Sequence, residues 1–554
     1  MTVARLVFVV GFLMLFVGTG WETGITGKDE FWVTMRTPLE MMERDSYWTL
    51  WLNDEVRLQK PPLIYWLIAG FYHLFGVHLW AARLVGVLSG AGMAALTAKL
   101  YKRLFGRSGF LAGILVLATA GVAVEGRRAM LDLPLGFFCL WSVYLALAAH
   151  QDGNRNLWIG SGAALAAATL AKGPQSLIFV LPALILGYAM TPRRPSPKTL
   201  CGIAALAGAV FLALTLPWPL SMRILHADFL AELETQIVDN RLGKVDLGSP
   251  LNALGGALLL VVPWSFVLLT GLVRAFRRDP SFGRDPRIRW LAGWFLLSLL
   301  PFFFMKAFER YMIPLIPCAS LLVVLTLEQA GERARRVLLT TSATLMAIVA
   351  VVFSLFGLWF HLTFWSSLVS MALMLWMVWT AVKADRIDRP VVACAWLFMF
   401  LLGVVYPRLG VNRIPDDLPW HELRKHPVGI YSRYSQPSML SMRLERSVDF
   451  PREDRLVADG YHGYIFTTRP ELEDPDHSDN RHGYLDRALE AASVPYEIAG
   501  SYHAFFSRRN WIKFTRPDAT GDDWLDALKS RDLRNLKSEI VYVRTGRLAS
   551  NPRK

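Results

Sequence analysis

The stretch RLVFVVGFLMLFVGTGWETGITGKDE, residues 5–30, joins an apolar run of membrane-spanning length to a pair of carboxylates. Residues 5–21 carry one charge, Arg5, and are long enough to cross the hydrocarbon layer of a bilayer as a helix. A cleaved signal peptide is the alternative, but no small-residue cleavage site precedes the charged loop. We therefore predict an uncleaved first helix that brings Asp29 and Glu30 to the membrane surface, a position that suggests chemistry on a charged lipid.

Composition places the whole chain among membrane proteins. Hydrophobic residues make up 53% of the 554 positions, 20 residues are Trp, and the mean hydropathy is +0.33. A soluble core cannot bury this much apolar surface. Apolar runs recur along the first 408 residues, and we predict about thirteen transmembrane helices. They cover residues 5–21, 80–101, 108–124, 131–149, 157–171, 174–190, 199–221, 251–273, 289–304, 311–327, 337–357, 363–382 and 390–407.

Basic residues set the expected orientation, because short loops rich in Lys and Arg stay on the cytoplasmic side of a membrane. Five such loops fall on one face of the predicted bundle. Their basic residues are Lys102, Arg103, Arg107, Arg193, Arg194, Lys198, Arg274, Arg277, Arg278, Arg284, Arg287, Arg289, Arg333, Arg335, Arg336, Lys383, Arg386 and Arg389. The N-terminus is then expected in the cytoplasm. The loops at residues 22–79 and 222–250 and the C-terminal tail are expected on the outer side of the membrane.

Residues 409–554 differ in character from the membrane part. Strand-like runs at residues 428–431 and 464–467 alternate with a helical stretch at residues 485–492, which predicts a small soluble α/β domain. This tail carries 23 Lys plus Arg against 22 Asp plus Glu, which leaves 36 against 23 for residues 1–408. The net charge of +14 therefore reflects membrane topology and does not indicate a nucleic-acid partner. We predict a transmembrane catalytic domain, residues 1–408, followed by a periplasmic domain, residues 409–554.

Metal, disulfide and cofactor chemistry have no signal in the sequence. The four cysteines lie in or beside predicted spans, and none is spaced with His as a metal ligand would be; they are Cys139, Cys201, Cys318 and Cys394. No glycine-rich loop could cradle a phosphate. We expect no metal and no cofactor.

Ionisable residues gather on the expected outer face, where the positive-inside pattern makes cations least expected. The first loop, residues 22–79, contains Asp29, Glu30 and the run Gln59-Lys60-Pro61-Pro62, together with amphipathic and aromatic segments that suit the membrane surface. The other outer-face residues of interest are Arg127, Arg128, Asp132, Lys172, Arg241, Lys244, Lys306, Arg310 and Tyr311. A lone cation there could be ion-paired or reach toward the headgroups. Cations that converge would hold a phosphate or pyrophosphate.

The order of these motifs resembles the GT-C glycosyltransferases of the protein O-mannosyltransferase superfamily, and within it the bacterial 4-amino-4-deoxy-L-arabinose:lipid A transferase family. The resemblance covers residues 1–410. Its strongest pieces, in chain order, are Asp29-Glu30, Lys60-Pro61, Asp132, Lys172-Gly173 and Arg310-Tyr311-Met312-Ile313-Pro314. It implies about thirteen membrane helices, interfacial helices in the first loop and an external C-terminal domain.

By this resemblance, the donor is a sugar on polyprenyl phosphate and the acceptor is lipid A or a related envelope molecule. The leaving lipid phosphate is an anion, so preorganised cations would stabilise its developing charge. The cations given this role are Lys60, Arg241, Lys172 and Arg310. Asp29 would orient or deprotonate the acceptor, and Asp132 would bind the acceptor or hold a basic side chain in place. Further substrate contacts are expected from Glu30, Gln59, Arg128 and Tyr311.

The first loop also departs from the aminoarabinose branch. Phe31-Trp32-Val33 stands where that branch has Thr-Arg-Tyr, and Gln59 replaces a Glu before the loop Lys. Sugar and acceptor therefore stay open, and a protein O-glycosyltransferase of the same superfamily is one alternative. Another is a transporter or flippase of lipid-linked sugars, although transporters usually place ionisable groups near the membrane midplane. A non-catalytic envelope assembly protein is the third.

Overall fold

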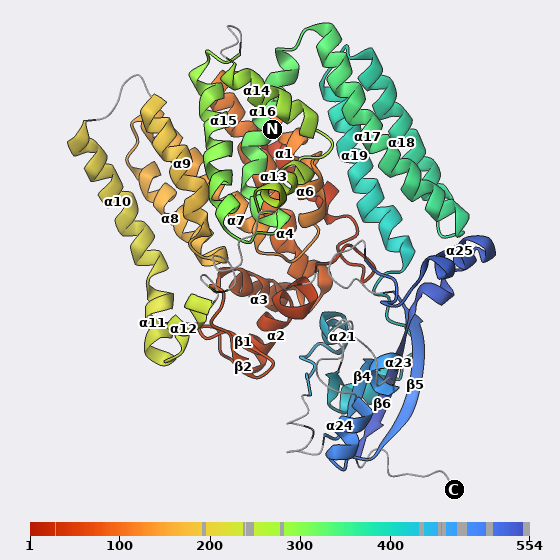
Figure 1. Ribbon diagram of the computed structural model, residues 1–554. Helices are drawn as coiled ribbons and strands as arrows, with labels where there is room; N and C mark the ends of the chain where they lie inside the picture. The colour runs from red at the N-terminus through yellow and green to blue at the C-terminus, as the bar shows by residue number, and fades with distance from the viewer. Residues whose placement is uncertain are drawn as a thin grey trace.

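The protein is a bundle of helices with a small sheet domain below one end (Figure 1). The first loop, which joins α1 to α4, lies on the same end of the bundle and contacts the sheet domain. The computed structural model describes residues 1–27, 29–190, 196–235, 239, 249–277, 282–431, 437–451, 456, 461–473, 485–505 and 513–546.

Most bundle helices are apolar and long. Among the described residues, eight helical stretches could cross a membrane, and a bent pair would make a ninth. The bundle helices are α1 (Val3–Phe16), α4 (Leu79–Phe105), α5 (Phe110–Leu117), α6 (Ala120–Glu125), α7 (Asp132–Asp152), α8 (Asn156–Lys172), α9 (Gln175–Met190), α10 (Pro197–Thr215), α11 (Pro217–Leu225), α12 (Phe229–Glu234), α13 (Ser249–Leu260), α14 (Ser265–Phe276), α15 (Pro286–Leu299), α16 (Ile316–Glu328), α17 (Glu332–Trp359), α18 (Trp365–Lys383) and α19 (Asp388–Phe400). Every predicted apolar range contains helix, and the number of true spans stays a prediction.

Two predicted spans are broken rather than straight. Residues 251–273 form α13 and α14, which are bent by 114° relative to each other. Pro263 lies at the break, and proline both lacks an N–H and disfavours helix in the residue before it. Residues 108–124 form α5 and α6, since the Thr119 hydroxyl accepts the backbone N–H of Val122 and begins a new helix. The prediction of one continuous helix in each range is therefore wrong.

Short non-α segments extend several bundle helices. They are η4 (Leu300–Phe304) after α15, η5 (Glu309–Leu315) before α16, and η6 (Leu401–Val405) with η7 (Tyr406–Leu409) after α19. Pro314 lies inside η5. Because proline disfavours α-helical backbone in the preceding residue, this segment stays 3₁₀ and only α16 continues as regular helix.

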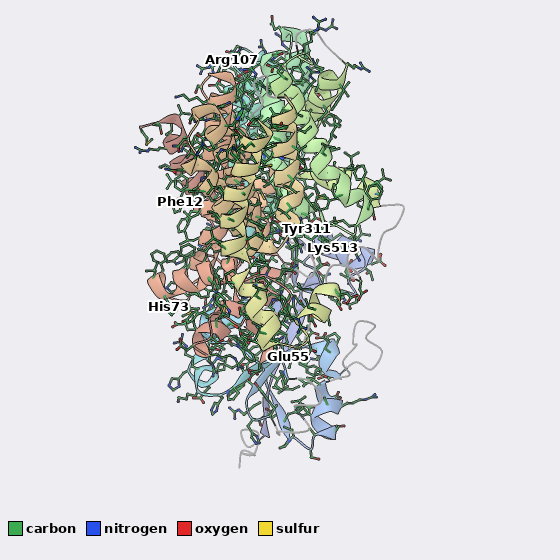
Figure 2. The ribbon with its side chains drawn as sticks, turned by 90° about the vertical axis from the view of Figure 1, so that its left-hand side faces the viewer. Phe12, Glu55, His73, Arg107, Tyr311 and Lys513 are labelled. Carbon is green, nitrogen blue, oxygen red and sulfur yellow. The ribbon has the colours of Figure 1, made fainter. Side chains whose placement is uncertain are left out.

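Basic loops gather at the end of the bundle away from the first loop. Arg107 pairs with Glu328 at the end of α16, with 3.0 Å between Nη1 and Oε2. Arg287 at the start of α15 donates to the backbone oxygen of Leu104 at 2.7 Å. Figure 2 shows Arg107 near one end of the molecule, well separated from Glu55 in the first loop. Arg107 and Arg287 thus lie at the end of the bundle away from the first loop, and the side of the membrane that each end faces stays a prediction.

The first loop folds into short elements that pack beneath the bundle (Figure 1). They are η1 (Glu30–Thr34), α2 (Arg36–Glu43), β1 (Trp51–Leu52), β2 (Glu55–Val56) and α3 (Leu63–Phe75). The hydroxyl of Tyr72 on α3 donates to the backbone oxygen of Met35 at 3.3 Å, which ties α3 to the start of α2. The segments expected as interfacial helices therefore form α2 and α3, and their position at the membrane surface stays a prediction.

The C-terminal region contains a four-stranded sheet in the order β3-β4-β6-β5. The strands are β3 (Val428–Ile430), β4 (Tyr464–Thr468), β5 (Tyr496–Ala504) and β6 (Ser538–Thr545), and the helices are α20 (Trp420–Lys425), α21 (Pro437–Leu444), α23 (Arg469–Glu473), α24 (Leu485–Ala491) and α25 (Gly521–Ser530). Strand β3 is parallel to β4, whereas β6 is antiparallel to both β4 and β5. This confirms the predicted small α/β fold, including strands at residues 428–431 and 464–467 and a helix at residues 485–492.

The sheet domain is docked on the first loop. Arg36 of α2 is fully buried and donates to the backbone oxygen of Val448 at 3.1 Å, while its guanidinium lies 4.5 Å from the ring centre of Phe450. Burial lowers the pKa of Arg36 to about 10. The Asn412 amide donates to Thr26 at 3.0 Å. Met35 also shares one apolar core with residues of the sheet domain. The first loop, which carries Asp29, is therefore held against the sheet domain by hydrogen bonds, a cation–π contact and apolar packing.

Candidate functional site

Four charged side chains from distant segments meet where the first loop joins the bundle. Asp29 precedes η1, Asp132 begins α7, Lys172 ends α8, and Arg310 belongs to η5. Arg310 Nη2 lies 2.6 Å from Asp29 Oδ2, and Arg310 Nε lies 3.5 Å from Asp132 Oδ2. Lys172 Nζ forms an ion pair with Asp132 Oδ1. We call these four residues the ion network.

Local structure favours each charge where it lies. Asp132 is in the first turn of α7 and Lys172 is in the last turn of α8, so each side chain complements the dipole of its own helix. Gly173 follows with a φ of +99°, a left-handed value that suits glycine and ends α8 beside the ion network. The α7–α8 pair therefore presents a carboxylate and an ammonium to each other.

Exposure differs across the ion network. The side chains of Asp132 and Lys172 are 3% and 6% exposed, that of Arg310 is 21% exposed, and that of Asp29 is 48% exposed. Asp132 thus lies inside and binds both cations, while Asp29 lies at the open end. Of the two roles predicted for Asp132, the geometry favours holding basic side chains in place.

An aromatic ring borders the buried end of the ion network. Lys172 Nζ lies 3.8 Å from the ring centre of Tyr311, and the guanidinium carbon of Arg310 lies 5.8 Å from the same centre. The negative face of an aromatic ring attracts cations, most strongly away from water. Gln175 Nε2 contacts the backbone oxygen of Tyr311 at 3.5 Å. Figure 2 shows Tyr311 between Arg107 and Glu55 along the length of the molecule.

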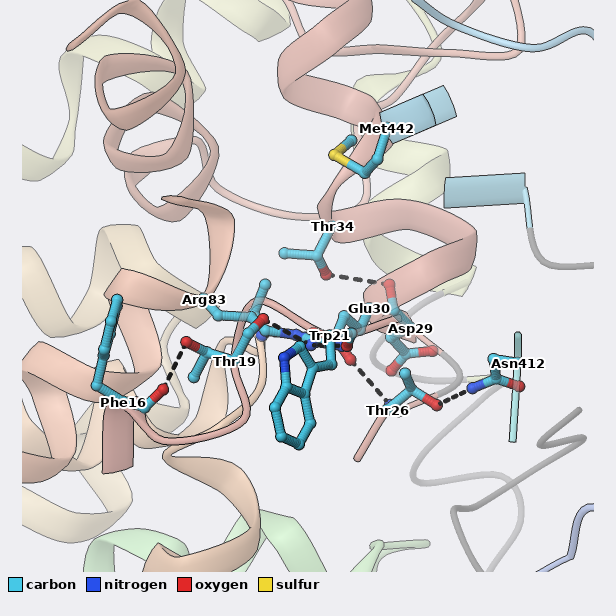
Figure 3. A network of polar contacts seen from close by, with 12 residues as sticks. Phe16, Thr19, Trp21, Thr26, Asp29, Glu30, Thr34, Arg83, Asn412 and Met442 are labelled. Carbon is cyan, nitrogen blue, oxygen red and sulfur yellow. Dashed lines mark hydrogen bonds and ion pairs between the residues drawn. The ribbon is translucent and has the colours of Figure 1, made fainter. Parts of the chain in front are cut away.

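Glu30 has a different position from its neighbour Asp29. Its side chain is fully buried and accepts from Arg83 Nε at 2.9 Å, from the backbone N–H of Gly27 at 3.1 Å and from that of Ala129 at 3.1 Å (Figure 3). Arg83 in turn donates to the backbone oxygens of Thr19 and Trp21. Glu30 therefore holds the first loop to α4, and its expected substrate contact stays a prediction.

Arg128 is also buried and lies 2.5 Å from Glu125, between Nη1 and Oε1. Glu125 interacts electrostatically with Asp132 and Arg310 as well. Glu125 was not predicted as a site residue, since it precedes the basic pair at the end of an apolar run and resembles an ordinary helix terminus. Within the described residues, Arg128 Nε and Nη2 have no hydrogen-bond partner, so its predicted substrate contact stays a prediction.

The Gln59-Lys60 part of the first loop lies near α12. Gln59 Nε2 donates to Glu232 Oε2 at 3.4 Å. A carboxylate from α12 therefore lies beside Gln59, which replaces the Glu of the aminoarabinose branch. Glu232 was not predicted as a site residue from the sequence. Lys60 is half-buried. Arg241 and Lys244 lie outside the described residues, and the donor-phosphate roles of Lys60 and Arg241 stay predictions. Among described residues, no group of three His, Cys, Asp or Glu side chains could hold a metal.

Comparison with known proteins agrees with this architecture. Residues 59–220 match the family of dolichyl-phosphate-mannose-protein mannosyltransferases. ArnT from Cupriavidus metallidurans, in a crystal structure with bound undecaprenyl phosphate, superposes with a TM-score of 0.70 at 16% identity over 99% of both chains. The chain therefore shares the fold of ArnT, a bundle of apolar helices with a small sheet domain.

Proteins similar in sequence to this chain include several aminoarabinose transferases. The undecaprenyl phosphate-alpha-4-amino-4-deoxy-L-arabinose arabinosyl transferase 1 of Pseudomonas fluorescens is 26% identical over 478 residues, which cover 80% of this chain and 78% of that protein. The corresponding transferase of Pseudomonas paraeruginosa is 28% identical over 317 residues, 53% of this chain and 55% of that protein. An uncharacterized protein of Aquifex aeolicus is 28% identical over 215 residues, 38% of this chain and 42% of that protein. The last two matches span about half of each relative's length. The chain is close to the aminoarabinose transferase family, as the motifs predict.

Proposed function

We propose that this protein is a polyprenyl-phosphate-sugar-dependent glycosyltransferase of the bacterial inner membrane. It transfers a sugar to lipid A or a related envelope acceptor on the periplasmic face. The observation that carries the proposal is the ion network, in which Asp29, Asp132, Lys172 and Arg310 converge from four remote segments. The similarity to arabinosyl transferases that act with undecaprenyl phosphate supports the donor class.

The reaction forms a bond between an acceptor oxygen and the anomeric carbon of the sugar. The bond from that carbon to the phosphate oxygen breaks, and its electron pair leaves with the lipid phosphate. Asp29 is the most exposed carboxylate of the ion network and is oriented by Arg310. It accepts the proton of a hydroxyl acceptor, or positions an acceptor phosphate that is already ionised.

Cations stabilise the charge that develops on the leaving phosphate. Arg310 offers a planar guanidinium that suits a phosphate, and its position between Asp29 and Asp132 fixes it before substrate binds. Lys172 is almost fully buried against Asp132 and Tyr311. It therefore acts by holding the Asp132 carboxylate in place and by neutralising its negative charge. Lys60 and Arg241 remain our candidates for the direct donor-phosphate contact.

The test is a transfer assay with purified protein in lipid nanodiscs, supplied with a polyprenyl-phosphate sugar and a lipid A acceptor. We expect glycosylated acceptor and released polyprenyl phosphate in equal amounts. Asp29→Asn should lower the rate of both about 10²–10⁴-fold, whereas Asp152→Asn, which alters an ion pair at the other end of the bundle, should leave both unchanged. Donor movement across the bilayer without a new glycosidic bond would identify a flippase and refute the proposal.

A protein acceptor is the second candidate, favoured by the match of residues 59–220 to protein mannosyltransferases. The same assay with envelope proteins in place of lipid A separates the two. Sugar found on protein side chains, with lipid A unmodified, would assign the chain to protein O-glycosylation and overturn the lipid acceptor.

A further inference from the structure

A second charged site lies outside the ion network. A cavity of about 560 Å³ opens between the segment after α1, the connection from α3 to α4, the residues after α19 and helix α21. The side chains that matter for its chemistry are Trp21, His78, Trp80, Arg408, Arg413 and Arg443. None of Asp29, Asp132, Lys172 or Arg310 lines it, so the cavity is separate from the proposed catalytic site.

The cavity has two guanidinium groups to offer an anion. Arg443 pairs with Glu22, with 3.1 Å between Nη2 and Oε2, and with Asp416 at 2.9 Å. Arg408 and Arg413 are exposed, and within the described part of the chain neither guanidinium has an acidic partner. Three arginines against the two acidic partners of Arg443, Glu22 and Asp416, leave a net positive charge around the cavity. Guanidinium forks match the oxygens of a phosphate, which makes a phosphate the favoured anion.

An apolar strip leads from the bundle to this cavity. On α1, Val9, Leu13 and Phe16 are exposed by 45%, 59% and 36%. The ring centre of Phe16 lies 6.2 Å from that of Trp80, which lines the cavity. Exposed apolar side chains along a helix, followed by Trp at their end, are the pattern of a helix that meets lipid tails and then headgroups. The acyl chains of a lipid bound here would lie along α1, with its phosphate in the cavity.

The end of α3 borders the cavity from the other side. Leu74 and Phe75 are 74% and 46% exposed, and the ring centre of Phe75 lies 5.3 Å from that of Trp80. His78 also stacks on Trp80, with 5.8 Å between ring centres. Apolar side chains thus flank the entrance of the cavity, and its charged wall lies behind them. A free phosphate ion would use only the charged wall, whereas a lipid would use both parts.

We propose that this cavity binds the phosphate headgroup of an anionic glycerophospholipid from the surrounding bilayer. Arg408 and Arg413 bind the phosphate, Trp21 and Trp80 lie at the glycerol level, and the acyl chains follow the exposed face of α1. This inference does not depend on the proposed glycosyl transfer, because it concerns residues that the reaction does not use.

The cavity is also connected to the first loop through one buried side chain. Trp21 lines it, and the backbone oxygen of Trp21 accepts from Arg83 Nη1 at 3.1 Å (Figure 3). Arg83 Nε donates to Glu30, the residue next to Asp29. A lipid in the cavity thus packs against the segment that Arg83 holds.

The experiment is native mass spectrometry of the full chain released from nanodiscs of phosphatidylcholine with a minor fraction of phosphatidylglycerol. The wild type should retain phosphatidylglycerol in preference to phosphatidylcholine. The double variant Arg408→Gln/Arg413→Gln should lose this preference, with retention reduced about tenfold because charge-assisted hydrogen bonds are among the strong ones. The matched control Arg333→Gln/Arg336→Gln, which removes two arginines from the start of α17, should behave as wild type.

Three results would overturn the proposal. These are equal retention of both lipids by the wild type, unchanged retention by the double variant, and displacement of phosphatidylglycerol by millimolar inorganic phosphate as effectively as by added phosphatidylglycerol. The thermal unfolding midpoint of the double variant should equal that of wild type, since both arginines are exposed. The single variants Arg408→Gln and Arg413→Gln, each with a partial loss, provide a second test.

Discussion

Asp29 and Glu30 are adjacent in the chain and have opposite environments. Asp29 is half exposed and contacts Arg310 from η5, whereas Glu30 is fully buried and contacts Arg83 from α4. The first belongs to the ion network, and the second belongs to the packing of the first loop against the bundle. Two neighbouring acidic residues therefore have different positions: Asp29 is open to solvent, where we propose that substrate binds, and Glu30 holds the loop that carries it.

The largest effect is expected from Asp29→Asn. The amide keeps the shape of the side chain but cannot accept a proton, so kcat for sugar transfer should fall about 10²–10⁴-fold. The thermal unfolding midpoint should stay within a few degrees of wild type, because the side chain is half exposed. A variant with unchanged turnover in the nanodisc assay would remove Asp29 from the mechanism.

Glu30→Gln should act on stability. The change leaves the buried Arg83 guanidinium without its carboxylate, and breaking a buried ion pair in this way costs about 3–5 kcal/mol. The measurement is the unfolding midpoint in detergent, followed by size-exclusion chromatography. An equally stable Glu30→Gln protein with lost transfer activity would reverse the division of roles and return Glu30 to the substrate site.

Arg310→Lys keeps the positive charge but loses the geometry. One ammonium cannot contact Asp29 and Asp132 as the Nη2 and Nε of Arg310 do. Because misplacement of a catalytic group by about 1 Å can cost about 100-fold, kcat should fall by up to that factor. If the steady-state kinetics of Arg310→Lys matched those of wild type, a positive charge at this position would be sufficient for turnover. The proposed role of Arg310 in joining Asp29 and Asp132 would then be wrong.

The smallest effect is expected from Tyr311→Leu, which removes the ring beneath Lys172. A desolvated cation–π contact contributes about 2 kcal/mol, and part of this loss should appear as a several-fold lower kcat. Tyr311→Phe keeps the ring and serves as the control, with near-wild-type turnover. Equal loss in both variants would instead point to the hydroxyl, and the assigned role of the ring would fail.

The sequence predicted more of the fold than of the site. Apolar runs identified helical segments throughout the bundle, yet the 114° bend between α13 and α14 replaced one predicted straight span. In the site, Asp29, Asp132, Lys172 and Arg310 were all singled out from their order along the chain. A basic partner was one of the two roles predicted for Asp132, but the identity of its partners and the pair of Asp29 with Arg310 were not predicted. Glu125 and Glu232 were missed, because their interactions with Arg310 and Gln59 join residues far apart in sequence.

Sequence alone determined the class of this protein, since length and placement of apolar runs depend on the nearly fixed thickness of a bilayer. The expected orientation of the bundle and the α/β character of the C-terminal domain likewise depend on local sequence, namely on basic loops and on alternating strand and helix patterns. Tertiary structure alone decided that the side chain of Asp29 is half exposed whereas that of Glu30 is buried. It also decided that Asp132 pairs with two cations, and that three arginines line one cavity together with two Trp side chains. Such outcomes depend on which helices pack together, and a carboxylate binds whichever cation the packing brings within about 3–4 Å.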